Sequence, residues 1–354
     1  GGAGNDTIAG GLGADSLDGG PGADLYMILL ATEHPQAEIH DSGTGIDELR
    51  YADTQAGTLT LFAGDSGIER VVVGTGTAAS ANSTATTALN VNAAAVGNAL
   101  WIVGNAGANT LTGTAFADTL QGGDGVDRLV GGAGNDVYWV DLDASGAMRD
   151  TVLESLNGGF DTLELQGDLV NTSVATLTLG ANLEALDGSY TTINANNLPS
   201  LLVLNTAFPY LPVSPSTTLP GVGLLNLTGN ALDNRLTGNA ANNRLNGAAG
   251  NDTLAGSAGI DTLVGGAGND VLVGGTGADC FVFDTAPNAQ NNLDTVSDFT
   301  MNLDRLQFSR AAFTSLGSVN GLLSRSLFYA ANDASRGHDA DDRIIYNTST
   351  GALY

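Results

Sequence analysis

The sequence predicts an all-β protein: an elongated parallel β-roll or β-solenoid whose blocks are joined by short-strand capping segments. Three observations predict this class: a repeat of nine residues, glycine at 50 of 354 positions, and acids that are mostly aspartate. This glycine content is about twice the usual share. Of the 38 acidic residues, 31 are Asp and 7 are Glu, and Asp favours turns whereas Glu favours helix.

The nine-residue repeat occurs thirteen times in three blocks, residues 1–27, 104–139 and 229–282. Position six is Asp in ten copies and Asn in three, and position eight is large and apolar in every copy. Glycine supplies the turn, and three residues then form a strand whose middle side chain points inward. Two repeats therefore make one coil of 18 residues with a turn on each edge. Successive turns on one edge stack at about 4.8 Å.

This stacking brings the repeat carboxylates together in pairs. The predicted pairs are Asp6 with Asp24, Asp118 with Asp136, Asp252 with Asp270, and Asp261 with Asp279. Two carboxylates about 4.8 Å apart repel by roughly 3.5 kcal/mol at an effective dielectric constant near 20. A cation between the turns reverses this sign. Ca²⁺ suits flexible oxygen shells better than Mg²⁺, and soft metals require Cys or His, which these turns lack.

The pattern GGxGxDxUx, in which U is large and apolar, resembles the RTX (repeats-in-toxin) nonapeptides, the hemolysin-type calcium-binding repeats of secreted bacterial proteins. The resemblance implies a parallel β-roll with Ca²⁺ bound in the turns. The expected carboxylate ligands are Asp6, Asp15, Asp24, Asp118, Asp127, Asp136, Asp252, Asp261, Asp270 and Asp279. The turn glycines expected to offer backbone carbonyls are Gly2, Gly4, Gly20, Gly22, Gly132, Gly134, Gly266, Gly268, Gly275 and Gly277. Weaker candidates are Asn109, Asn234 and Asn243.

Some repeats depart from the pattern. GNALDNRLT and GNAANNRLN carry Asn at position six and lack the glycine at position four, so we expect a metal-poor entrance to the third roll. GTAFADTLQ has Phe116 in place of that glycine, which puts a site that uses its backbone in doubt.

Two spacers separate the rolls, residues 28–103 and 140–228. Period-two alternation predicts strands within them at 58–62, 70–73, 162–165 and 176–179. The phrases GTGIDELRYA and GGFDTLELQG resemble caps that cover the open edge of the last coil. Residues 199–220 hold five of the eight prolines and are interpreted as a linker or an irregular excursion.

The tail, residues 283–354, resembles the segment that closes RTX proteins. The resemblance implies a capping segment and the signal for type I secretion. Asp339, Asp341 and Asp342 are interpreted as a solvated acidic turn rather than as a cation site. Because the sequence starts within a repeat, we expect the chain to be a part of something longer.

The catalytic signals are weak. The sequence has no lysine and no H-E-x-x-H motif, and its three histidines are scattered. The stretch 64–67 (GDSG) is similar to a serine-protease nucleophile loop, but a tight turn is the favoured interpretation. We expect no enzymatic activity from these residues. The net charge of −27 argues against nucleic acid as a partner, and no run of 18 apolar residues predicts a membrane span.

The predicted function is that of a secreted, calcium-dependent RTX region. A structural or adhesive role at the bacterial surface, of the S-layer, fibre or adhesin type, is favoured, with other copies of the chain as possible partners. The alternative is an export-and-folding module of an upstream extracellular protease or lipase. A minor alternative is an ice-binding array. The type I secretion machinery is the expected partner during export, which the resemblance implies.

Overall fold

A computed structural model describes residues 1–76, 81–143, 147–155, 158–166, 174–187, 224–286, 288, 290–314, 328–331, 344–347 and 349. The described chain is nearly all β-structure, with one turn of 3-10 helix, η1 (Ala31–Glu33). It contains two compact units. The proline-rich stretch 199–220 and the acidic cluster of Asp339, Asp341 and Asp342 lie outside the described residues.

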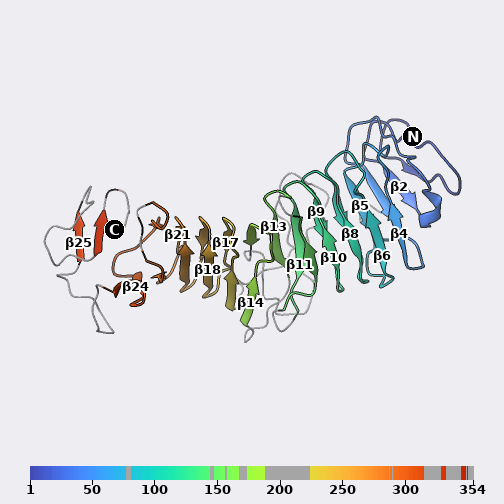
Figure 1. The fold of residues 1–354 in the computed structure, drawn as a ribbon. Helices are drawn as coiled ribbons and strands as arrows, with labels where there is room; N and C mark the ends of the chain where they lie inside the picture. Colours follow the sequence, from blue (N-terminus) through green and yellow to red (C-terminus); the bar gives the residue numbers. More distant parts are fainter. Residues whose placement is uncertain are drawn as a thin grey trace. The chain divides into compact units, whose positions relative to one another are not determined.

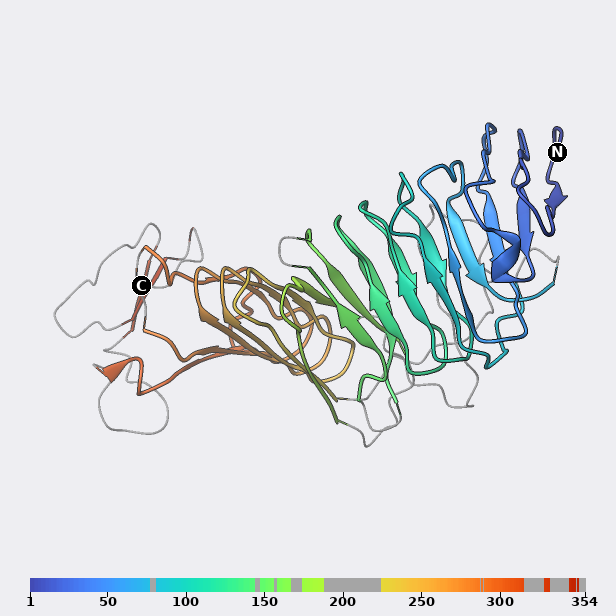
Figure 2. The same ribbon diagram turned by 45° about the vertical axis from the view of Figure 1, so that its right-hand side comes forward.

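The first unit comprises residues 1–143 and the described part of 148–167, and it is a parallel β-solenoid (Figures 1 and 2). Its first sheet has the order β1-β2-β3-β5-β7-β9-β11-β13. The bounds of these strands are Thr7–Ile8, Leu25–Ile28, Glu48–Tyr51, Arg70–Val73, Trp101–Val103, Thr119–Gln121, Val137–Asp141 and Thr162–Gln166. The second sheet, β12-β10-β8-β6-β4, lies on the other side of the coils. Its strands are Thr151–Leu153, Arg128–Val130, Thr110–Thr112, Leu89–Asn92 and Gly57–Thr60.

The second unit repeats this arrangement with the third roll. One sheet contains β15 (Ala185–Asp187), β17 (Arg235–Thr237), β19 (Thr253–Ala255), β21 (Val271–Val273) and β23 (Thr295–Val296). The other contains β14 (Val174–Thr178), β16 (Leu224–Thr228), β18 (Arg244–Ala249), β20 (Thr262–Ala267), β22 (Cys280–Phe283) and β24 (Arg305–Phe308). A separate parallel pair joins β25 (Phe328–Ala331) and β26 (Ile344–Asn347). In the described part of the chain, no helix is long and apolar enough to pass through a bilayer.

The register within the rolls confirms the 18-residue coil. Thr253 pairs with Val271 across β19 and β21, and Thr119 pairs with Val137 across β9 and β11. The large residue at position eight points into the interior and is fully buried in most repeats, as in Leu254. The fold class predicted from the sequence is therefore confirmed.

The spacer strands were predicted at nearly the observed places. The segments 58–62, 70–73, 162–165 and 176–179 correspond to β4, β5, β13 and β14, with shifts of at most two residues at either end. The capping role expected for GTGIDELRYA is wrong. Its strand, β3, pairs on both sides, because Leu49 lies opposite Tyr26 in β2 and opposite Val71 in β5. This segment is therefore part of an interior coil. The extra residues before β3 lie in a longer turn at the solvent edge, so the pairing of β3 with β2 and β5 is not disturbed.

Candidate calcium sites

The aspartates at position six form columns along each edge of the rolls. The backbone N–H of Asp252 donates to Oδ1 of Asp270 at 2.8 Å, and that of Asp261 donates to Oδ1 of Asp279 at 2.9 Å. The same bond joins Asp6 to Asp24 at 2.6 Å and Asp118 to Asp136 at 2.7 Å. All four predicted pairs are therefore neighbours. In each pair, one carboxylate oxygen binds the turn of the preceding coil.

The other carboxylate oxygen, Oδ2, is buried without a hydrogen-bond partner in most of these aspartates. They are Asp15, Asp24, Asp127, Asp136, Asp252, Asp261, Asp270 and Asp279. Asp6 and Asp118 differ from this set. Oδ2 of Asp6 accepts the N–H of Gly2 at 2.7 Å, and Oδ2 of Asp118 accepts the hydroxyl of Thr114 at 2.9 Å. A buried carboxylate oxygen without a donor is costly, so the eight orphaned oxygens indicate an absent cationic partner.

The first glycine of each repeat opens the space beside Oδ2. A Cβ atom at Gly247 would overlap Oδ2 of Asp252 and would lie 2.5 Å from the carbonyl oxygen of Gly265 in the next coil. Gly256 stands in the same relation to Asp261 and to the carbonyl of Gly274. A carboxylate oxygen and a backbone carbonyl oxygen therefore converge on one small space. Position one was not among the glycines predicted as ligands.

The glycines at positions two and four shape the turns. Nine of the ten that were expected to offer carbonyls have positive φ, and Gly2 does not. A Cβ atom at Gly268 would overlap the carbonyl oxygen of Gly250, because that carbonyl points along the stack toward the next turn. Only glycine combines this backbone conformation with so close an approach. The carbonyls of these turns therefore lie between coils, where a cation would need them.

Burial and neighbouring carboxylates change the titration of the columns. Burial raises the pKa of Asp127, Asp136, Asp252 and Asp261 to about 7, and the charge of a stacked acid adds to this effect. The N–H donated to Oδ1 opposes the shift in each case. Without a cation, these carboxyl groups are only partly ionised at neutral pH. A bound cation would restore their full charge.

The donor set fits Ca²⁺. Orphaned carboxylate oxygens and backbone carbonyls are hard oxygen ligands, which Ca²⁺ takes in flexible shells of six to eight. Asp252 with Asp270, and Asp261 with Asp279, would hold it together with carbonyls of the intervening turns. Bound there, Ca²⁺ would supply the positive charge that the stacked carboxylates lack.

Comparison with known families identifies the repeats. Residues 1–26 and 103–138 match the RTX calcium-binding nonapeptide repeat, described as four copies. These are RTX nonapeptide repeats. Residues 224–346, which include the third RTX roll, match the family described as Peptidase M10 serralysin C terminal. RTX nonapeptide repeats bind calcium ions, and both families are characteristic of secreted extracellular bacterial proteins. Among curated proteins, the search found no significant match to the chain.

Three RTX repeats contain an amide pair instead of an orphaned carboxylate. In each of them, Asn stands at both position two and position six. Nδ2 of Asn109 donates to Oδ1 of Asn105 at 3.0 Å, and Nδ2 of Asn243 donates to Oδ1 of Asn239 at the same distance. The pair at Asn230 and Asn234 has the same bond at 3.2 Å. An amide supplies its own donors, so these turns need no cation to offset charge.

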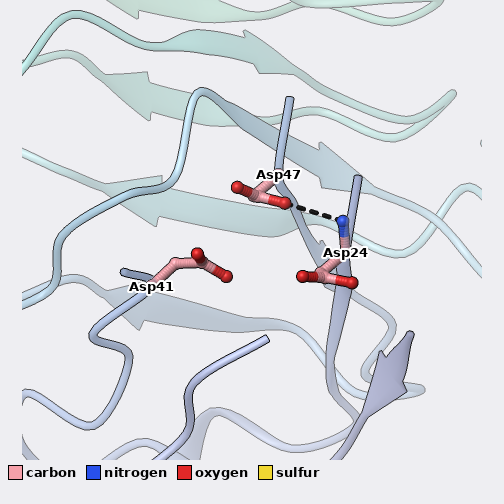
Figure 3. Close-up of side chains that lie close together, drawn as sticks. All are labelled: Asp24, Asp41 and Asp47. Atoms are coloured by element: carbon pink, nitrogen blue, oxygen red, sulfur yellow. Dashed lines mark hydrogen bonds between the residues drawn. The ribbon is translucent and has the colours of Figure 1, made fainter. Parts of the chain in front are cut away.

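The columns continue beyond the RTX repeats through acids that sequence reasoning missed. The N–H of Asp24 donates to Oδ1 of Asp47 at 2.7 Å (Figure 3), and that of Asp279 donates to Oδ1 of Asp304 at 2.9 Å. The other acids that accept in this way are Glu38, Asp65, Glu69, Asp150, Asp161 and Asp294. Most precede an apolar residue by two positions, as the repeat aspartates do. That spacing is the signal that could have found them.

One coil between the first two RTX rolls places a buried histidine beside two column carboxylates, and it bonds one of them, while Oε2 of Glu38 stays without a hydrogen-bond partner. The buried His34 lies with Nε2 2.9 Å from Oδ2 of Asp65 and with Nδ1 3.7 Å from Oε2 of Glu38. Burial alone would raise the pKa of Asp65, but the hydrogen bonds from His34 and from the backbone of Phe62 and Glu38 hold it below its ordinary value. The GDSG stretch is therefore a turn whose aspartate anchors His34. Sequence reasoning had not paired these two residues.

Proposed function

We propose that this chain is a calcium-triggered folding region of a secreted bacterial protein, open in low Ca²⁺ and folded in the extracellular medium. The observation that supports it is the set of buried Oδ2 atoms along the columns, which have no donor of their own. Without Ca²⁺ these stacked carboxyl groups oppose closure of the coils. With Ca²⁺ they become ligands that join one coil to the next.

Several sites are needed for such a switch. Extracellular calcium modules have dissociation constants of about 10⁻⁴–10⁻³ M, so they are empty in cytosol and partly filled at millimolar Ca²⁺. A site at a few times its Kd stabilises the fold by only about 1 kcal/mol, against roughly 2.7 kcal/mol at 100 times Kd. Repetition of the site along the stack therefore makes folding responsive to Ca²⁺ in this range.

Circular dichroism of the whole chain tests this proposal. We expect β-structure in millimolar Ca²⁺, its loss in EDTA, and little recovery in equimolar Mg²⁺. The paired variant Asp252→Asn/Asp270→Asn should require more Ca²⁺, whereas Asp124→Asn, an exposed turn carboxylate, should behave as the parent does. Equal β-structure in EDTA and in Ca²⁺ would refute the proposal.

For the wider role of the protein, we propose a structural or adhesive surface component. The RTX rolls at 1–27 and 104–139 lie outside the serralysin C-terminal match, which supports a role beyond the end of an enzyme. Electron microscopy of the purified chain should then show filaments or sheets in Ca²⁺ that disappear in EDTA. A persistent monomer would count against this role.

The second candidate is an export-and-folding module of an extracellular enzyme. The serralysin C-terminal match over residues 224–346 favours it, because that family names a non-catalytic part of a protease. Under this role, the yield of an active exported enzyme fused to the chain should depend on Ca²⁺ and on the third RTX roll. Secretion and activity unchanged after loss of the third-roll aspartates would contradict it.

A further inference from the structure

Three carboxylates gather where the first RTX roll ends, and three more gather where the second one ends. One oxygen each from Asp24, Asp41 and Asp47 lies within 4.8 Å of the other two (Figure 3). Asp136, Glu154 and Asp161 form the second group with the same spacing. In each group, the first acid belongs to the final repeat, the last belongs to the next coil, and the middle one comes from the insertion between them.

Each group contains an orphaned, buried oxygen. Oδ2 of Asp24 is buried without a partner, and so is Oδ2 of Asp136. A Cβ atom at Gly19 would overlap Oδ2 of Asp24 and would lie 2.6 Å from Oδ2 of Asp41, so both oxygens face the same space. Two ligands that each lie 2.3–2.6 Å from one Ca²⁺ can be at most about 5 Å apart. The spacing of the carboxylates therefore fits a single Ca²⁺ ion.

A tyrosine holds the middle acid at each group. The hydroxyl of Tyr26 accepts the N–H of Gly19 at 2.7 Å and donates to Oδ2 of Asp41. The hydroxyl of Tyr138 donates to Oε1 of Glu154 in the same way. These two repeats are the only ones of the thirteen with tyrosine at position eight.

The third roll shows what happens without the tyrosine. Its final repeat has Phe281 at position eight, and the acid of the following insertion is Asp298. Oδ1 of Asp298 accepts the N–H of Gly274 at 2.9 Å, and Oδ2 accepts that of Gly275 at 2.7 Å. This acid is used to bind the turn itself. In the first roll the Tyr26 hydroxyl lies between Gly19 and Asp41, so Oδ2 of Asp41 faces Oδ2 of Asp24, while Oδ1 of Asp41 accepts the N–H of Gly43 at 2.7 Å.

We propose that the ends of the first and second RTX rolls each bind one additional Ca²⁺ through three carboxylates: Asp24, Asp41 and Asp47 in one site, and Asp136, Glu154 and Asp161 in the other. We name these the roll-end sites. They differ from the repeat sites because one ligand comes from an insertion and a tyrosine hydroxyl orients it. The proposal rests on the calcium dependence proposed above.

Calcium counting on the whole chain tests the roll-end sites. Equilibrium dialysis at saturating Ca²⁺ should show one bound ion fewer in Asp41→Asn and one fewer in Glu154→Gln. The matched control is Asp298→Asn, the corresponding acid of the third roll, which should lose none. Circular dichroism in Ca²⁺ checks that each variant has folded.

Tyr26→Phe gives a second measurement that keeps all the ligands. We expect the affinity of one site to fall about 10-fold or more, as when a group that orients a ligand is removed. Tb³⁺ serves as a luminescent probe that is excited by energy transfer from a nearby tyrosine. If Tyr26 excites only the ion bound by Asp41, then Tyr26→Phe, Asp41→Asn and the double variant should all lose the same fraction of the emission.

The outcomes separate this inference from the proposed function. If the parent folds with Ca²⁺ but Asp41→Asn and Glu154→Gln bind as many ions with unchanged affinity, the roll-end sites do not exist. If Asp41→Asn fails to fold, unchanged Tb³⁺ emission and affinity in Tyr26→Phe overturn the proposal. A parent chain that binds no Ca²⁺ overturns both.

Discussion

The aspartate at position six divides its two oxygens between two tasks. In Asp270, Oδ1 accepts the N–H of Asp252, while Oδ2 is buried without a donor. The first task builds the stack, and the second, under the proposed function, makes the stack respond to Ca²⁺. The glycine at position one is required by the second task, because its missing Cβ leaves the space for the cation.

We expect Gly265→Ala to damage the calcium site without removing a ligand. Its Cβ would overlap Oδ2 of Asp270. The Ca²⁺ concentration at the folding midpoint, followed by circular dichroism, should rise about 10-fold or more. Gly97→Ala is the control, because a Cβ there meets nothing within 4 Å. Similar midpoints for the two variants would show that position one does not matter for the site.

His34 shows a protein side chain that lies against column carboxylates. It is buried between Asp65 and Glu38, so its removal leaves carboxylates without their partner. We expect His34→Leu to cost about 3–5 kcal/mol, the usual effect of breaking a buried pair. The urea midpoint of the first unit, followed by the fluorescence of Trp101 and Trp139, measures it at saturating Ca²⁺. His40→Leu, at an exposed histidine, should change it little, and equal effects would contradict this role.

At the scale of the element, a coil is a pair of short strands whose stability depends on the turns that join them. Strands such as β19 and β21 have three residues each, so the side-chain columns contribute much of the contact between coils. Within one column, a repeat with Asp adds a carboxylate charge, whereas a repeat with paired Asn adds a neutral amide, as where Asn234 precedes Asp252. The two kinds share one backbone register.

The apo coils should therefore respond to pH in a defined direction. Burial raises the pKa of Asp252 and Asp261 to about 7 in the folded chain, against about 3.9 when unfolded. The folded state then binds more protons than the unfolded state between these values, so stability falls as pH rises from about 4 to 7. In calcium-free buffer, β-structure should increase as the pH is lowered from 7.5 to 4.5. Circular dichroism measures this, and a decrease over that range would contradict it.

Sequence reasoning located the elements whose signal is local. The nine-residue period predicted the coils, because every repeat carries its own turn and its own inward residue. The strand at 70–73 was predicted from the pattern of the spacer strands and the turn residues between them. The coil of β3 was misinterpreted as a cap, because local sequence does not reveal that a strand has neighbours on both sides.

At the scale of the whole molecule, the described coils differ in the basic side chains that they contain. Residues 247–282 contain no basic side chain. The coils of residues 34–73 contain His34, and also Arg50 and Arg70, which both contact Glu48. The two segments therefore differ in the basic side chains available to balance their acidic charge.

We expect hydrogen exchange to show this difference. As Ca²⁺ is added to the whole chain, amides of 48–73 should become protected at lower concentrations than amides of 247–282. Peptide-resolved exchange with mass spectrometry measures both segments in one sample. If the two segments become protected at the same Ca²⁺ concentrations, the chain folds as a single unit and the basic side chains of residues 34–73 do not influence the order of folding.

The site was less predictable than the fold because its residues lie far apart in the sequence. His34 and Asp65 are 31 residues apart, and the coils between the first two rolls have turns of different lengths, so no period relates them. Asp47 and Asp161 follow glycines and precede an apolar residue by two positions, but they lie 23 and 25 residues after Asp24 and Asp136 instead of 18. Asp304 has the apolar residue but no glycine turn before it. Which acids share a column depends on the number of residues in each turn. Only the three-dimensional stack determines this.

The hydrogen bonds of the columns all run one way, and this gives the stack a polarity. Each N–H at position six donates to the carboxylate of the following coil, as Asp252 donates to Asp270 and Asp270 donates to Asp294. If the last coil at the C-terminal end is removed, the N–H at position six of the preceding coil loses its acceptor. If the first coil at the N-terminal end is removed, its N–H goes with it, and the carboxylate of the following coil loses a donor. The two ends of a folded stack are therefore unequal as starting points for folding. A coil that is added at the N-terminal end always finds a carboxylate oxygen that can accept its N–H.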